Sequence, residues 1–93
     1  MLPVVWNSKA TANLAKILDF IATRSPLAAD MMQERFSRAV ERLPDHPLAY
    51  REGLVPGTRE LVVHASYVLV YRVEIGEIRI VAILHTSQQY PPE

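Results

Sequence analysis

The first half of the chain contains two stretches in which apolar residues recur at helical spacing. At the start of the first stretch, Asn7 or Ser8 can cap a helix, because a short polar side chain accepts hydrogen bonds from the free amides of a first turn. Lys16 and Asp19 fall away from the apolar face. That face is formed by Ala10, Leu14, Ile17, Leu18 and Ile21. The spacing predicts an amphipathic helix.

The second stretch begins at Ser25-Pro26, a serine cap followed by proline at the first helical position. On its polar side Glu34 precedes Arg38 by four residues, the order that favours an ion pair along a helix. Its apolar face is formed by Ala29, Met32, Phe36, Val40 and Leu43. Two prolines follow within four residues and end the helix. Together the two stretches predict an antiparallel helical hairpin.

Strand patterns lie on both sides of this hairpin. Leu2, Val4 and Trp6 alternate with their neighbours, which predicts a short first strand. A loop rich in proline and glycine is expected over residues 44–57. Three further strands are predicted at residues 58–64, 67–74 and 77–85. Only two residues separate consecutive strands, so hairpins must join them into an antiparallel meander.

The middle strand of this meander, residues 67–74, is largely apolar on both faces. One face is expected to take the helices, and the other to form a concave surface that the C-terminal tail or a partner covers in part. The expected fold is a single α+β domain over residues 1–93 in the order β-α-α-β-β-β. Its antiparallel sheet is packed on one face by the N-terminal helical hairpin.

Composition narrows the function classes. The ten basic and ten acidic residues leave no net charge, whereas a protein that binds mainly by neutralising phosphates usually has a basic excess. A local basic patch is still compatible with this balance. Without cysteine there is no disulfide, thiolate zinc site or thiol nucleophile, which fits a reducing cytoplasm. The start of the chain lacks the pattern of a secretion signal, and its longest apolar run is too short to span a membrane. A cytoplasmic protein is expected, without a membrane partner.

Two arginines near a glycine-containing bend are the first candidates for chemistry. Arg51 and Arg59 could hold phosphates in a bidentate manner. The alternative is that Arg59 pairs with Glu52, Glu60 or a neighbouring strand. Arginine is common on strands, so both interpretations stay open.

His85 and Tyr90 are the other candidates. His85 ends the last strand, where it could act as a general acid or base, or be a hydrogen-bonded structural residue. Tyr90 could stack on a base or cover the edge of the sheet. The three histidines lie on different elements without metal-ligand spacing, and no glycine-rich phosphate loop is present. Neither a metal nor a cofactor is therefore expected.

Several sequence blocks together resemble the RelE/ParE superfamily of bacterial toxins, the toxin halves of type II toxin–antitoxin operons. The blocks are ILDFIA from Ile17, SPLAA from Ser25, LPDHP from Leu43, GTREL from Gly57, YVLVYRV from Tyr67 and LHTSQQYP from Leu84. Within the superfamily, AILH followed by a tail with glutamine and proline is most similar to the ParE-type plasmid-stabilisation toxins.

The resemblance implies a cognate antitoxin, which wraps a partly disordered segment around the toxin and forms a hetero-oligomer with it. It also implies one of two targets. RelE-type members cut messenger RNA in the ribosome, whereas ParE-type members poison DNA gyrase and show no nuclease of their own. A third possibility is a non-toxic relative that acts only as the partner of a repressing antitoxin complex.

On the RelE-type interpretation, Arg59 would hold phosphate, His85 would assist proton transfer and Tyr90 would lie near the scissile phosphate. Strongly cationic ribosome-dependent members place lysines before GTREL, and this chain has none there. Its zero net charge also fits poorly with entry among ribosomal RNA phosphates. Both departures favour inhibition of gyrase, with an enzyme as the alternative.

On the ParE-type interpretation, residues of the sheet and tail contact the target or the antitoxin. These residues are Arg51, Arg72, His85, Gln88 and Tyr90. The placement of the arginines distinguishes the two interpretations, because convergence of Arg51, Arg59, Arg72 and Arg79 with His85 favours the nuclease. Strict alternation places Arg79 on the same face as Val81, Ile83 and His85, and Arg59 on the same face as Leu61 and Val63.

Overall fold

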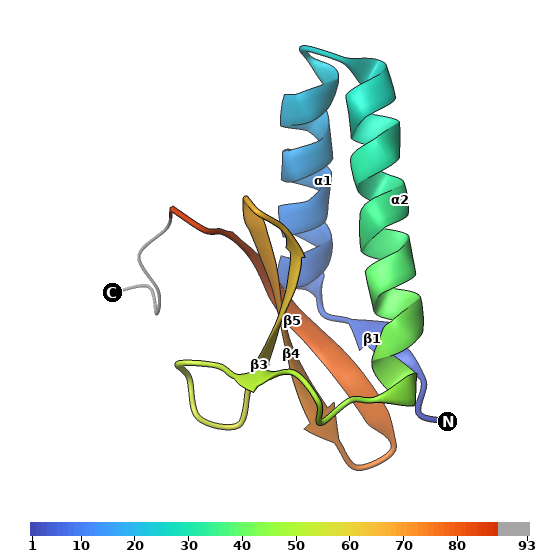
Figure 1. The fold of residues 1–93 in the computed structure, drawn as a ribbon, viewed down its shortest axis with the longest axis vertical. Coiled ribbons are helices and arrows are strands. Elements are labelled where there is room, and N and C mark those ends of the chain that lie inside the picture. The colour runs from blue at the N-terminus through green and yellow to red at the C-terminus, as the bar shows by residue number, and fades with distance from the viewer. Residues whose placement is uncertain (88–93) are drawn as a thin grey trace.

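The computed structural model describes residues 1–87, so the predictions for Gln88 and Tyr90 lie outside the described residues. Two helices lie side by side against one face of a sheet (Figure 1). The elements in chain order are β1 (Val4–Trp6), α1 (Ser8–Ala22), α2 (Pro26–Arg42), the 3-10 turn η1 (Leu43–Asp45), β2 (Arg51–Glu52), β3 (Arg59–His64), β4 (Tyr67–Glu74) and β5 (Glu77–His85). The predicted α+β fold class is confirmed.

Local hydrogen bonds explain where the helices begin. The Asn7 side chain accepts a hydrogen bond from the Ala10 amide at 2.8 Å, and the Ser25 hydroxyl accepts one from the Ala28 amide at 3.1 Å. Each cap satisfies an amide that has no partner within its own helix. Pro26 then occupies the first turn of α2. Both predicted caps are confirmed, the first at Asn7.

The sheet has the strand order β1-β5-β4-β3-β2. The predicted antiparallel meander of β3, β4 and β5 is confirmed. Gly76 makes the β4–β5 turn with φ +84°, a backbone conformation that residues with a Cβ atom rarely adopt. At the far edge, β1 runs parallel to β5, so the complete sheet is mixed. The predicted loop contains β2, which pairs with β3 and is only two residues long. Such a short strand has no detectable periodicity.

A β-bulge in β5 changes which face each side chain occupies. Val70 pairs with Ala82, but the next residue, Tyr71, pairs with Ile80, so Val81 is left as the inserted residue. Ile80 and Ile83 both belong to the core beneath the helices as a result. The prediction that Arg79 shares a face with Ile83 and His85 is wrong, because the inserted residue reverses the alternation.

The core lies between the sheet and the lower part of the helical hairpin. Phe36 is 1% exposed, and Leu43, Leu69 and Tyr71 are fully buried. The upper part of the hairpin extends beyond the strands (Figure 1). In that part Phe20 and the start of α2 keep much of their apolar surface in contact with solvent, with Leu27 69% exposed. The hairpin therefore presents surfaces that the sheet does not cover.

Candidate functional site

Arg51 and Arg59 lie on neighbouring strands but on opposite faces of the sheet. Arg51 is directly opposite Glu60, and its Nε donates to a Glu60 carboxylate oxygen at 2.8 Å. Arg59 is the next residue along β3, so its side chain points to the other face. The two guanidinium groups are therefore not brought together, and Arg51 already has a carboxylate partner.

Arg59 holds the loop that precedes β2. Its guanidinium donates to the carbonyl oxygens of Leu48 at 3.1 Å and Tyr50 at 2.8 Å. Tyr71, opposite Arg59 on β4, donates its hydroxyl to the Pro47 carbonyl oxygen at 2.6 Å. Desolvation by burial raises the pKa of Tyr71 to about 12, although the nearby Arg59 charge acts in the opposite direction. Arg59 and Tyr71 together fasten the loop to the sheet.

The other two arginines of the sheet also have partners. The Arg79 guanidinium contacts the carboxylates of Glu74 at 2.9 Å and Glu77 at 2.6 Å. The hydrogen bond to Glu74 raises the pKa of Arg79 above its ordinary value, and the charge of Glu77 acts in the same direction. Arg72 donates a long hydrogen bond of 3.4 Å to the Pro56 carbonyl oxygen. None of these contacts directs an arginine toward His85.

His85 has its Nδ1 atom occupied by a local turn. The Ser87 amide donates to Nδ1 at 3.0 Å, and the Ser87 hydroxyl lies 2.6 Å from the same atom. Nδ1 therefore acts as an acceptor, and the neutral ring carries its proton on Nε2. In this tautomer the ring lone pair on Nδ1 faces the two Ser87 donors. To act as a general base through Nδ1, the His85 ring would have to give up these contacts with Ser87.

His64 repeats the same local geometry on the other side of Tyr67. The Ser66 amide donates to His64 Nδ1 at 3.0 Å. The rings of His64 and His85 lie 6.2 and 5.4 Å from the Tyr67 ring, the second in an edge-to-face arrangement. The His-x-Ser pattern at both strand ends is visible in the sequence, but its effect on the ring tautomer emerges only from the turn geometry. Among residues 1–87, no three side chains of histidine, aspartate or glutamate lie together in a way that could hold a metal ion.

Two clefts meet at His85. One, of about 470 Å³, lies beside α1 and is lined by residues that include Ile17, Phe20 and Tyr67. The other, of about 460 Å³, includes Leu54 and residues of the opposite sheet face, namely Arg51, Glu60, Val68 and Leu84. His85 therefore lies at a rim between two partly apolar surfaces. Such a position suits contact with a macromolecule.

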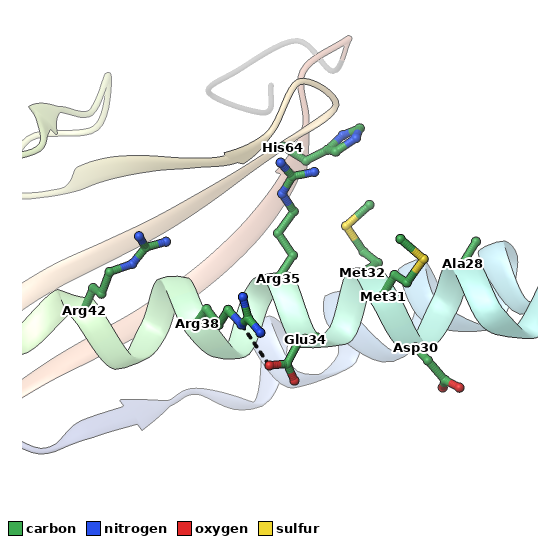
Figure 2. A pocket seen from close by; sticks show the side chains of 9 residues that line it. All are labelled: Ala28, Asp30, Met31, Met32, Glu34, Arg35, Arg38, Arg42 and His64. Atoms are coloured by element: carbon green, nitrogen blue, oxygen red, sulfur yellow. Dashed lines mark hydrogen bonds and ion pairs between the residues drawn. The ribbon is translucent and has the colours of Figure 1, made fainter.

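A third cleft, of about 730 Å³, lies between α2 and the end of β3, where His64 is located. Figure 2 shows the side chains of Arg35, Arg38 and Arg42 along the helix beside it. The apolar spacing of α2 predicts only its buried face, so this cleft was not predicted from the sequence. The available signal was helical spacing from Met31 through these three arginines, which lie 4, 7 and 11 residues further on.

No helix within residues 1–87 combines the length and apolar character needed to cross a membrane.

Comparison with known proteins identifies the family. The family model described as "ParE toxin of type II toxin-antitoxin system, parDE" matches residues 4–90. The curated protein "Toxin RelE2" of Caulobacter vibrioides is 42% identical over 89 residues, which cover 95% of this chain and 99% of that protein.

Solved structures show the same fold. A chain of the "Chromosomal ParDE TA system from P. aeruginosa" matches with a TM-score of 0.80 and 28% identity, covering 91% of this chain and 96% of that one. The "YoeB/ParE toxin from Agrobacterium tumefaciens" matches with a TM-score of 0.62 at 14% identity, covering 90% and 98%. At that identity the likeness concerns the fold alone. The family match and the Caulobacter relative show that the chain belongs to the ParE toxins of the RelE/ParE superfamily, the toxin components of type II toxin–antitoxin systems.

Proposed function

We propose that this toxin inhibits DNA gyrase and is neutralised by a cognate antitoxin with which it forms a hetero-oligomer. The observation that carries the choice of target is the dispersal of the sheet arginines. Arg51 pairs with Glu60, Arg59 holds a loop, and Arg79 pairs with two carboxylates. An RNA-cleaving site needs cations gathered around the scissile phosphate and a group able to take a proton.

His85 fits this proposal as a contact residue. Its Nδ1 accepts hydrogen bonds from the Ser87 turn, while its ring lies where two clefts meet. The partly apolar lining on both sides of the rim suits a protein surface better than a row of phosphates. Arg51 and Arg72 belong to the same proposed contact surface, together with Gln88 and Tyr90.

The antitoxin has a proposed place on the sheet face opposite the helices. Val62 is 53% exposed there, and Leu54 and Leu84 line the nearby cleft. A partly disordered segment that folds on binding can cover such a surface, because it spreads over a large area.

The alternative is a ribosome-dependent endoribonuclease that uses Arg59, His85 and Tyr90. The name of the Caulobacter relative, "Toxin RelE2", favours this alternative. On this proposal the Ser87 turn would have to open, so that the His85 ring gains a nitrogen able to accept a proton.

Supercoiling of relaxed plasmid by purified gyrase, titrated with the antitoxin-free toxin, tests the proposal. We expect inhibition with accumulation of cleaved DNA. Arg72→Glu should weaken inhibition, and Arg24→Glu, the same charge change at the α1–α2 turn, should leave it unaltered. If a folded toxin arrests growth but does not inhibit gyrase even at large excess, the alternative function, cleavage of messenger RNA, would be favoured. Absence of growth arrest would identify a non-toxic antitoxin partner.

A further inference from the structure

Three arginines lie along one exposed stripe of α2, away from the core. Met31, Arg35, Arg38 and Arg42 follow one another at intervals of four, three and four residues, so their side chains leave the same side of the helix. The buried residues of α2, which include Phe36 and Ala39, leave it in a different direction. The stripe borders the cleft of about 730 Å³ between α2 and the end of β3 (Figure 2).

The arginines of this stripe differ in whether a carboxylate forms an ion pair with them. Arg38 donates to Glu34 at 2.9 Å. Within residues 1–87, Arg35 and Arg42 form no ion pair with a carboxylate, and both are exposed. They lie seven residues apart, a rise of about 10 Å along the helix. The cleft is therefore lined by two arginines that have no ion-pair partner in the described part of the chain.

The two ends of the cleft differ in chemistry. Figure 2 shows Met31 and Met32 near one another on α2, while Arg35 reaches toward His64. Met31 is 66% exposed. Methionine side chains are flexible and polarisable, so they adapt to apolar side chains of varied shape. An occupant that matches the whole cleft needs apolar groups at one end and negative charge along the rest.

We propose that the α2–β3 cleft binds an acidic amphipathic helix of a partner protein. Carboxylates spaced three or four residues apart on such a helix would face Arg35, Arg38 and Arg42, because both helices rise 1.5 Å per residue. Its apolar side chains would pack against Met31 and Met32, as in other helix-in-groove complexes. The inference extends beyond the proposed function, since it does not depend on gyrase being the target.

Nucleic acid fits the cleft less well. Asp30 and Glu34 line it beside the arginines. A run of phosphates would lie close to these carboxylates without gaining from the methionines, whereas an acidic helix can place its apolar residues there. Charge complementarity combined with an apolar end therefore favours a protein partner.

Fluorescence anisotropy with the full chain tests the inference. The probe is a labelled synthetic helical peptide with glutamates along one stripe and leucines beside it, and the control peptide has lysine in place of every glutamate. The test variant is Arg35→Glu/Arg42→Glu. Its matched control is Lys9→Glu/Arg24→Glu, which makes the same change in net charge on exposed positions outside the cleft. Circular dichroism verifies that each variant is folded.

We expect the glutamate peptide to bind the unchanged chain and the control variant alike. Reversing Arg35 and Arg42 should weaken this binding about tenfold or more, and should transfer the preference to the lysine peptide. Equal binding of both peptides by the unchanged chain, or equal binding by both variants, would overturn the inference. It would also be overturned if a single-stranded oligonucleotide bound and lost affinity on the Arg35/Arg42 reversal while the glutamate peptide did not bind.

Discussion

The arginines of the sheet and those of α2 occupy contrasting environments. On the sheet, Arg51 and Arg79 contact carboxylates, and Arg59 donates to two loop carbonyl oxygens. On α2, only Arg38 has a carboxylate partner among residues 1–87, while Arg35 and Arg42 face a cleft. The sheet arginines donate to carboxylates or carbonyl oxygens of the fold, whereas the guanidinium groups of Arg35 and Arg42 border a cleft in which a partner can reach them.

The contrast shows why residue type alone is a weak guide to function. Arg59 was a candidate phosphate ligand, yet it holds backbone carbonyl oxygens of residues 48 and 50, eleven and nine positions before it. Arg35 was not among the predicted site residues, yet it lines the cleft of about 730 Å³ beside α2. The distinction depends on what lies across each side chain in three dimensions.

The largest expected effect is on the free energy of unfolding, and it distinguishes the buried face of α2 from its exposed face. Phe36→Ala should lower the free energy of unfolding by about 3–4 kcal/mol, because it removes a 1% exposed ring and leaves a cavity. Arg35→Ala, at the neighbouring exposed position, should change it by less than about 0.5 kcal/mol. Urea denaturation of both variants measures the difference. Similar losses would mean that the outer face of α2 contributes to the fold, and would break the contrast.

The inner face of α2 was predicted from the sequence, since Ala29, Phe36 and Leu43 follow helical spacing and are buried. The limits of β4 and β5 also followed from the sequence, because two-residue separations leave room only for hairpins. The β-bulge at Val81 did not. An inserted residue in an apolar strand leaves the composition unchanged and alters only the register, which depends on pairing with Tyr71.

A second effect concerns the buried loop attachment at Tyr71. The pKa of Tyr71 is raised to about 12 from its ordinary value of 10.0, so the folded state favours the neutral hydroxyl. Its stabilising contribution is fully present below about pH 10 and is lost as the pH rises through 12. The loss should reach about 2 kcal/mol by linkage. Denaturation of the unchanged chain and of Tyr71→Phe, from pH 9 to 12, measures the difference.

Subtraction of the two curves removes the titration of the other tyrosines and of the lysines. Tyr71→Phe should be less stable near pH 9, because the Pro47 carbonyl oxygen loses its donor. The two curves should then converge as the pH rises. Parallel curves would show that burial does not raise the pKa of Tyr71 in the folded chain.

A third, smaller effect tests whether Arg59 is structural. Arg59→Ala should lower the free energy of unfolding by about 1–2 kcal/mol, because two carbonyl oxygens lose a charged donor. Arg59→Lys should recover part of this loss, since an ammonium group can donate to one of them. Thermal unfolding gives the ranking. Unchanged stability for Arg59→Ala, together with lost toxicity, would return Arg59 to the functional candidates.

The smallest effect on stability sharpens the contrast most directly. Glu34 and Arg38 are exposed and separated by one helical turn, so Glu34→Gln should change the free energy of unfolding by less than about 0.5 kcal/mol. The same substitution removes the carboxylate that neutralises Arg38 and leaves three unbalanced arginines along the cleft.

Binding of the glutamate peptide to Glu34→Gln should therefore tighten about two- to fivefold, and the gain should shrink in high salt as exposed charges are screened. Glu41→Gln provides the matched control, because it removes one exposed carboxylate of the same helix that does not line the cleft. A gain of equal size in both variants would indicate an effect of net charge. A gain confined to Glu34→Gln would mean that Glu34 competes with a partner for the guanidinium group of Arg38. Ion pairing within the helix would then determine how many arginines of the stripe can bind a partner.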